Sequence, residues 1–265
     1  MDSLVVLFWA LAGSVLSLFG GILLVKYASK RERFVRYALP FGAGALLATA
    51  FLGLLPEAVE GSDIHTTVAY AMGGFLAFFV LERLLGWFHH HHHDDAHGAR
   101  DRAHTGLVVI GDTLHNAIDG IALGAAFLVS PAAGIATAVA VAAHEIPQEI
   151  GDFGILLGKG MKPRRVVLVN VLSAFATVVM AMTTYWLGGL SGLDPALLLA
   201  VAAGLFIYIA ASDIIPDIHE KPRREGNVQA AMLLVGVLVL AGILAVTPHD
   251  HQDGAHKEDE DSLLH

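Results

Sequence analysis

Residues 134–158 read GIATAVAVAAHEIPQEIGDFGILLG, an apolar run interrupted by the hexapeptide HEIPQE at residues 144–149. The surrounding apolar residues are typical of a helix inside a membrane, where a charged side chain costs about 2.5–3.5 kcal/mol on insertion scales. Residues 112–127, DTLHNAIDGIALGAAF, combine apolar and polar residues in nearly the same way. Two such segments predict polar side chains that face the interior of a helical bundle and bind something there.

The composition of the chain predicts that it lies in a membrane. Hydrophobic residues make up 55% of its 265 residues and charged residues 15%, with a mean hydropathy of +0.63, which is more apolar surface than one soluble core can bury. A helix needs about 20 apolar residues to cross the hydrocarbon. Eight stretches offer such a length, namely residues 3–25, 38–56, 66–88, 106–129, 132–157, 166–187, 195–216 and 228–246. We therefore predict an all-α integral membrane protein with eight transmembrane helices, whose surroundings are the lipid bilayer and which has no nucleic acid partner.

Basic residues predict the orientation, because Lys and Arg are retained on the cytoplasmic side of a membrane. Every Lys and Arg except Lys257 lies in or beside the loops that follow the first, third, fifth and seventh predicted helices. Both termini are then expected outside, in a multi-pass protein of the cell membrane. The N-terminus has no basic region of the kind that precedes a cleavable signal peptide, so the first helix is expected to remain.

Two polar segments stand out in what we treat as one polytopic membrane domain, residues 1–265. The predicted cytoplasmic loop 89–104, HHHHHDDAHGARDRAH, contains seven histidines, and imidazole-rich tracts bind borderline metals without fixed geometry. A flexible polar linker is the alternative. The auxiliary metal ligands in this loop are His89, His90, His91, His92 and His93. The acidic tail 247–265 is expected to be disordered outside the membrane.

Metal binding is the chemistry that the polar residues of the fourth and fifth predicted helices favour. The chain has no cysteine, so imidazole, carboxylate and amide groups are the ligands that it can offer. These two helices contain no Lys or Arg, and their acidic residues are Asp112, Asp119, Glu145, Glu149 and Asp152. A bound cation would neutralise this charge inside the bilayer.

Helical spacing selects the side chains that point together, since residues four apart differ by about 40° around the axis and about 6 Å along it. The pairs are His115 with Asp119, His144 with Gln148, and Glu145 with Glu149. If the two helices face each other, these side chains form a cage of imidazoles, carboxylates and an amide. That mixture suits Zn²⁺, Fe²⁺ or Mn²⁺ better than the all-oxygen sites of Ca²⁺ and Mg²⁺.

Pro147 bears on both the fold and the alternative function. It removes a backbone donor and frees the carbonyl of Ala143, which predicts an interruption of the helix at membrane depth. The sequence HEIPQ is one residue from the H-E-x-x-H motif of zinc hydrolases, so a zinc-dependent intramembrane hydrolase is the alternative. The proline and the replacement of the second histidine by Gln148 weigh against a hydrolase. A passive metal sensor would bind the ion without moving it.

The segments HNAIDG and HEIPQEIGDF resemble the signature of the ZIP (Zrt/Irt-like) family of divalent metal transporters. The eight helices and the histidine-rich loop after the third extend this resemblance over essentially the whole chain. The resemblance implies transport into the cytoplasm of zinc, and also of iron, manganese or cadmium, as substrates of a protein that is no enzyme and needs no catalytic cofactor. It also implies a two-metal centre and an elevator-like shift of helices one, four, five and six against the others. A homodimer is compatible with it.

The resemblance assigns individual residues to these sites. It implies a main transport site, whose ligands are His115, Asp119, His144 and Gln148. It implies an adjoining second site, whose residues are Asn116, Glu145 and Glu149. Three further acids are candidates for the pathway, namely Asp112, Asp152 and Asp213. The histidine-rich branch of the family usually reads H-E-x-P-H-E, so Gln148 stands where a histidine is expected, and a weaker preference for zinc follows.

Two helix ends in the sequence are alike. The second predicted helix ends in GLLPE at residues 53–57 and the seventh ends in DIIPD at residues 213–217. With three helices on either side of the central pair, this likeness favours a 3+2+3 inverted repeat. The alternative is that both are common ways to end a helix.

Overall fold

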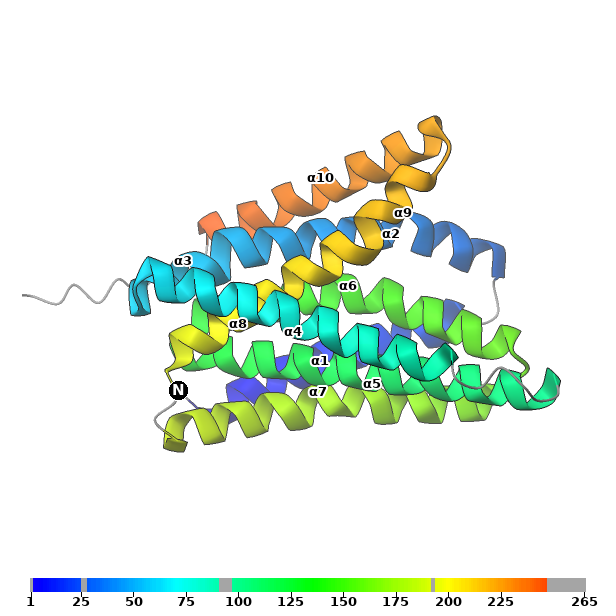
Figure 1. Ribbon diagram of the computed structural model, residues 1–265, viewed down its shortest axis with the longest axis horizontal. Helices are drawn as coiled ribbons and strands as arrows, with labels where there is room; N and C mark the ends of the chain where they lie inside the picture. The colour runs from blue at the N-terminus through cyan, green and yellow to red at the C-terminus, as the bar shows by residue number, and fades with distance from the viewer. Residues whose placement is uncertain (1, 25–27, 91–96, 192–193, 247–265) are drawn as a thin grey trace, which may run out of the picture.

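The computed structural model describes residues 2–24, 28–90, 97–191 and 194–246, which are helical almost throughout and contain no strand (Figure 1). Its elements are α1 (Ser3–Leu24), α2 (Ala28–Ala48), η1 (Thr49–Leu54), α3 (Leu55–Gly61), α4 (Ile64–His90), α5 (His97–Val129), α6 (Pro131–Gly158), α7 (Pro163–Ser191), α8 (Pro195–Ile209), η2 (Ala210–Ile214), α9 (Ile215–Glu220) and α10 (Arg223–Val246). The elements α2, η1 and α3 join end to end, as do α8, η2 and α9. The described residues therefore contain eight long helical segments, one over each predicted range.

The surface of the bundle is that of a membrane protein. Six helical segments are long and apolar enough to cross a membrane, and large apolar side chains such as Phe8, Phe175 and Leu238 point outward. Within the described residues, α5 and α6 are not among the six, and these helices contain the two polar motifs. The chain is thus a helical, multi-pass membrane protein. The count of eight crossings and the side of each terminus stay predictions.

Helix packing puts α5 and α6 at the centre of the structure. The helix α5 packs along α7 and α6, and α1 packs along α6 and α7, while α2 pairs with α10 and α4 pairs with α8. Contacts of α2 with α6 and of α8 with α5 join these groups, and the helices run side by side along the long axis in Figure 1. The polar motifs therefore lie where neighbouring helices exclude lipid.

Glycines let two of these helix pairs approach closely, as is usual between membrane helices. A Cβ added to Gly44 of α2 would meet the backbone of Leu233 in α10. One added to Gly74 of α4 would meet the backbone of Val201 in α8. Backbone cannot move aside as a flexible side chain can, so a larger residue at either position forces the two helices apart.

Two π-helical segments interrupt the bundle at matching places. Each of η1 and η2 is followed by a short helix with proline near its start, Pro56 in α3 and Pro216 in α9. Segments of this kind interrupt α-helices most often at functional sites. The motifs GLLPE and DIIPD thus share a local geometry, while the inverted repeat stays a prediction.

The predicted interruption at Pro147 is wrong, because α6 continues through this residue from Pro131 to Gly158. Tight packing supports the helix at this point. A Cβ on Gly42 of α2 would lie 2.7 Å from the Cα of His144 and 3.0 Å from the carbonyl oxygen of Ala143. The proline removes one hydrogen bond from α6, and α2 packs closely against the turn that precedes it.

Substitution of two neighbouring glycines of α4 by alanine, one at a time, tests the packing of α4 on α8. Gly74→Ala should lower the free energy of unfolding by about 1–3 kcal/mol, the usual cost of overpacking. Gly73→Ala is the matched control, because its Cβ would meet nothing within 4 Å and alanine is the better helix former by roughly 1 kcal/mol. Thermal unfolding of the purified variants in detergent measures both. Equal melting temperatures for the two variants would contradict this packing.

Candidate metal centre

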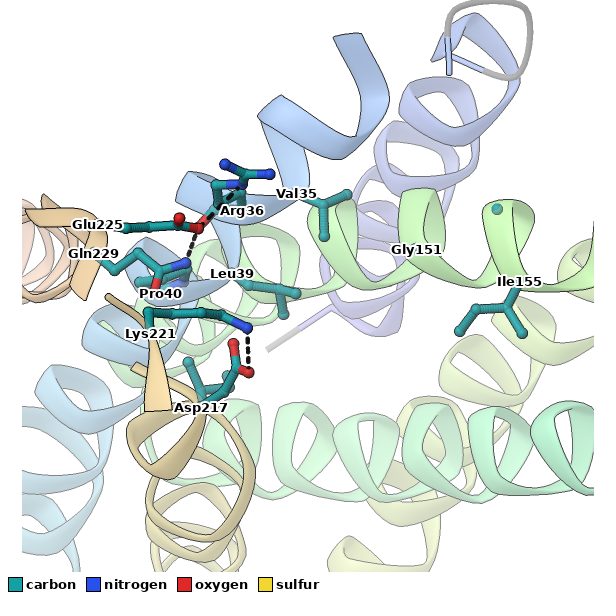
Figure 2. A pocket seen from close by; sticks show the side chains of 12 residues that line it. Val35, Arg36, Leu39, Pro40, Gly151, Ile155, Asp217, Lys221, Glu225 and Gln229 are labelled. Carbon is teal, nitrogen blue, oxygen red and sulfur yellow. Dashed lines mark hydrogen bonds and ion pairs between the residues drawn. The ribbon is translucent and has the colours of Figure 1, made fainter. Parts of the chain in front are cut away.

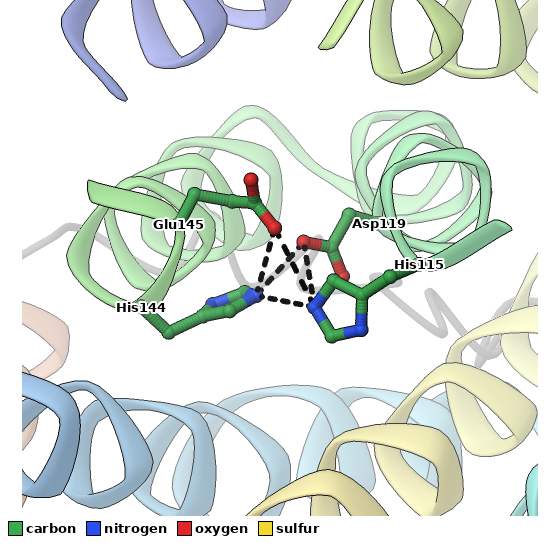
Figure 3. Close-up of side chains that lie close together, drawn as sticks. All are labelled: His115, Asp119, His144 and Glu145. Carbon is green, nitrogen blue, oxygen red and sulfur yellow. Dashed lines mark hydrogen bonds and ion pairs between the residues drawn. The ribbon is translucent and has the colours of Figure 1, made fainter. Parts of the chain in front are cut away.

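Four buried side chains from α5 and α6 converge at the centre of the bundle (Figure 3). His115 and Asp119 come from α5, and His144 and Glu145 come from α6. One ligand atom of each lies within 4.8 Å of the ligand atoms of the other three. Each of the four is at most 8% exposed, so the cluster is shielded from both lipid and bulk water.

The distances within this cluster fit the coordination shell of a small metal ion. A tetrahedral zinc ion with bonds of about 2.0–2.2 Å sets its ligand atoms about 3.3–3.6 Å apart. The two Nε2 atoms of His115 and His144 are 3.2 Å apart. Asp119 Oδ2 lies 3.9 and 2.9 Å from them, and Glu145 Oε1 lies 3.4 and 3.6 Å from them. Small side-chain shifts would bring all four onto one ion.

The hydrogen bonding of His144 prepares it as a ligand. Its Nδ1 lies 3.0 Å from the carbonyl oxygen of Ala140, one turn back in α6. A carbonyl can only accept, so Nδ1 carries the proton, and Nε2 is the ring nitrogen that faces the cluster and is left to bind a metal ion. This pattern, a backbone carbonyl behind a metal-binding imidazole, is common in metal sites and fixes the ring.

Two carboxylates make the site favourable for a dication. No described residue donates a hydrogen bond to the carboxylate oxygens of Asp119 or Glu145, and the nearest polar groups are the two imidazoles. Buried carboxylates without donors are costly. An ion of charge +2 cancels two carboxylates, and neutral imidazoles supply its remaining ligands, so the loaded site has no net charge.

Aromatic rings cover the histidines on one side. Phe78 of α4 lies edge to face with His115, and Phe206 of α8 lies edge to face with His144, each at a centroid distance of 6.3 Å. Phe206 is fully buried in the apolar cluster formed mainly by α2, α5, α6 and α8. The two imidazoles are therefore held between the carboxylates and an apolar wall, a feature that the sequence motifs did not predict.

Asn116 faces α7 instead of the cluster. Its Oδ1 accepts a hydrogen bond of 2.7 Å from the hydroxyl of Thr177. Its Nδ2 donates to Asp112 Oδ1 at 3.0 Å and lies 3.5 Å from Ser173 Oγ. Sequence reasoning missed Ser173 and Thr177, although Asn170, Ser173 and Thr177 follow one another at helical spacing on an otherwise apolar helix.

The other predicted site residues lie around the four ligands or outside the description. Glu149 is fully buried, and neither of its carboxylate oxygens has a hydrogen-bond partner among the described residues. Asp112 is buried, while Gln148 and Asp152 are half-buried. Gln148 lies one turn beyond His144 in α6, and Glu145 is one of the four clustered residues. The side chains of Asp213, His89 and His90, and residues 91–93 of the loop, lie outside the described part, as does the tail 247–265.

A cavity of about 680 Å³ begins beyond the cluster along α6 (Figure 2). Its wall in α6 includes Gly151 and Ile155. These residues follow His144 and Gln148 at intervals of three or four, so all four lie on one face of the helix. The face that contributes His144 to the cluster thus leads into the cavity.

Ion pairs line the far side of the same cavity (Figure 2). Arg36 of α2 pairs with Glu225 of α10 at 3.3 Å, and Lys221 donates to Asp217 of α9 at 2.7 Å. This hydrogen bond raises the pKa of Lys221, so its ammonium group stays charged at neutral pH. Gln229 donates to the backbone oxygen of Arg36 at 2.9 Å. This side of the cavity is therefore polar and charged.

Comparison with known proteins adds an independent finding. The family described as ZIP zinc transporter matches residues 3–106 and 89–244. Zinc transporter ZIP4 of Homo sapiens is 43% identical over 113 residues, which cover 42% of this chain and 17% of that protein. Zinc transporter ZIP6 of Homo sapiens is 41% identical over 111 residues, 42% of this chain and 15% of that protein. Metal cation symporter ZIP14 of Danio rerio is 39% identical over 139 residues, 52% and 28% of the two chains. The matched part of this chain thus spans less than a third of each of these relatives.

Removal of one ligand tests the cluster as a metal site. Loss of an outer partner of a metal ligand already costs about 10–100-fold in affinity, so Asp119→Ala and His144→Ala should each weaken zinc binding by at least about 100-fold. Neither substitution should unfold the metal-free protein. Asp119→Ala in particular removes a buried charge that lacks hydrogen-bond donors. Zinc titration of the purified variants measures the affinity. Glu60→Ala, at an exposed carboxylate on α3, is the control, and zinc binding as tight as in the wild type in both cluster variants would contradict the site.

Proposed function

Because the chain belongs to the ZIP zinc transporter family, we propose that it carries divalent transition-metal cations across the membrane through the cluster of His115, Asp119, His144 and Glu145. The observation that carries this proposal is the pair of buried carboxylates beside two imidazoles at the centre of a membrane bundle. Zinc is the first candidate, because two of the relatives are named zinc transporters. Iron, manganese and cadmium accept the same kinds of ligand.

The route of the ion continues from the cluster along one face of α6. Gln148 is the first polar side chain on the face that leads to the Figure 2 cavity. We assign it to the path as the group that receives the ion when it leaves the four ligands. The cavity lies near the start of α2 and the end of α9. The basic residues there are ones that the sequence assigns to the cytoplasm. The ion would therefore move into the cytoplasm through this cavity.

A second ion position beside the first is a further part of the proposal. A small space of about 10 Å³ touches both Asn116 and Glu145, and Glu149 lies one turn beyond Glu145 with unpaired carboxylate oxygens. Asp112 and Asp152 bring more negative charge to the same end of the bundle. Such a series would let an ion pass by exchange between weak sites, which favours release as well as binding.

Movement of one helix group past the other would open the site to each side in turn. The apolar contacts of Phe78 with His115 and of Phe206 with His144 support this, because they join the ligand helices to α4 and α8 without hydrogen bonds. The like geometry of η1 and η2 supports an inverted 3+2+3 repeat, as alternating access commonly uses. The histidine-rich loop 89–104 would hold metal ions on the cytoplasmic side.

The relatives are named as transporters, which weighs against the hydrolase alternative. The continuity of α6 removes one argument against a hydrolase, since Pro147 does not interrupt the turn after His144. The other argument remains: Gln148 stands where the zinc protease motif needs its second histidine. In the proposed site Asp119 and Glu145 both bind the ion, so neither is left free as the catalytic base of a hydrolase.

Uptake into proteoliposomes tests the proposed transport. Purified protein should move Zn²⁺ down an imposed gradient, and His144→Ala should reduce the initial rate to near that of empty vesicles, since the ion loses a central ligand. Intact binding without flux would identify a sensor instead. Hydrolysis of a peptide or lipid substrate, with no flux, would identify the alternative.

Selectivity is expected to depend on Gln148. An amide oxygen is a weaker and harder donor than imidazole, so Gln148→His should shift preference toward Zn²⁺ and away from Mn²⁺ and Fe²⁺, and should slow turnover because release is harder. Competition of several divalent ions against one tracer, at a single pH at which histidine is neutral, measures the shift. Gln148→Asn is the control, which keeps an amide. The same rank order of ions in wild type and Gln148→His would mean that Gln148 does not touch the ion.

A further inference from the structure

A second cavity lies on the opposite side of α2 from the Figure 2 cavity. It has a volume of about 620 Å³, within the range of roughly 300–1,000 Å³ that ligand pockets occupy. Its walls include Phe34 and Phe41 from α2, Ile146 and Pro147 from α6, and Met232 from α10. We call it the α2–α6 groove. The residues of α2 that line it are different from those that line the Figure 2 cavity.

The groove exists because α2 and α6 touch at one level and separate beyond it. At Gly42 the two backbones are in contact, since a Cβ there would lie 2.7 Å from the Cα of His144. Toward the start of α2 the space between the helices is left open on both sides, and Arg33 is the lining residue farthest from the contact. The groove therefore runs from the start of α2 up to the turn of α6 that contains Pro147.

The lining chemistry favours a hydrocarbon occupant. Of the nine residues that line the groove, only Arg33 and Tyr37 have polar atoms in their side chains. From Arg33 to Phe41 the helix rises by about 12 Å, at 1.5 Å for each residue, and one leaflet of the hydrocarbon core is about 15 Å thick. An acyl chain that enters beside Arg33 would thus reach the level of Pro147 within its own leaflet.

The charge at the end of the groove favours an anionic headgroup. Arg33 is exposed and makes no ion pair with any described residue, whereas Arg36, on the Figure 2 side of α2, is paired with Glu225. A guanidinium group binds a phosphate through two parallel hydrogen bonds. Basic residues at the cytoplasmic surface of a membrane attract anionic lipids by about 1 kcal/mol each.

We propose that the α2–α6 groove is a binding site for an anionic phospholipid, with an acyl chain against Phe34, Phe41 and Ile146 and the phosphate on Arg33. The bound chain would contact Ala143, which precedes His144 directly, and Pro147, which follows it by three residues in the same helix. The lipid would therefore support the turn of α6 that holds the ion. Lipid binding rests on the groove alone, and an effect on metal uptake rests in addition on the proposed transport.

Native mass spectrometry of the full chain in detergent tests the binding separately from transport. The protein is titrated with phosphatidylglycerol and with phosphatidylcholine of the same acyl chains. We expect a phosphatidylglycerol adduct that excess inorganic phosphate does not displace. Arg33→Gln should weaken it about five-fold, the equivalent of one surface charge, and Ala38→Trp, which fills the groove, should remove it.

Arg164→Gln is the matched control, because Arg164 is exposed in the first turn of α7 and lies outside the groove. It should bind phosphatidylglycerol as the wild type does. Equal adducts in wild type, Arg33→Gln and Ala38→Trp would overturn the proposal, as would phosphatidylcholine bound as tightly as phosphatidylglycerol. If the adduct behaves as expected but the wild-type protein moves no metal into proteoliposomes, the lipid site stands and the proposed transport fails.

Discussion

The charge of two carboxylates, Asp119 and Glu145, is the constraint on which the rest of the structure depends. They lie at most 3% exposed inside an apolar bundle, and within the described part of the chain only the two imidazoles lie near enough to pair with them. Neither fourth nor fifth predicted helix contains a Lys or Arg. A bound dication would neutralise this charge without a permanent partner. Two buried carboxylates without donors are costly in the empty site, which favours the binding of a cation. With a dication bound, the site would have no net charge inside the membrane.

The surrounding helices hold the two sides of the site by different kinds of contact. On α7, the hydroxyl of Thr177 donates to the side-chain oxygen of Asn116 and to its backbone oxygen, and so keeps the side chain turned from the cluster. On the other side, Phe78 and Phe206 press on the two imidazoles without polar contact. One side of the site is therefore fixed by hydrogen bonds, and the other is held only by apolar packing.

The helices and the motif residues could be predicted from the sequence, because apolar length and polar interruptions are local signals. The partners across helices could not. Helical spacing put both His144 and Glu145 in the predicted cage, but it did not give the distances, and the structure brings Glu145 together with the two imidazoles and Asp119. The close approach of Gly42 to the turn of α6 before Pro147 likewise joins residues about a hundred positions apart in the chain, so the sequence could not show it. Ser173 and Thr177 could have been suspected from their helical spacing, but their partner Asn116 could not.

X-ray absorption at the zinc edge, on the purified protein loaded with one equivalent of Zn²⁺, tests most directly that the cluster holds the ion. The account predicts a first shell of about four nitrogen and oxygen atoms at about 2.0–2.2 Å, with the outer-shell scattering of two imidazoles. In His144→Ala the scattering of one imidazole should disappear. A zinc ion with no imidazole scattering, or with the same imidazole scattering in His144→Ala as in the wild type, would contradict the central claim.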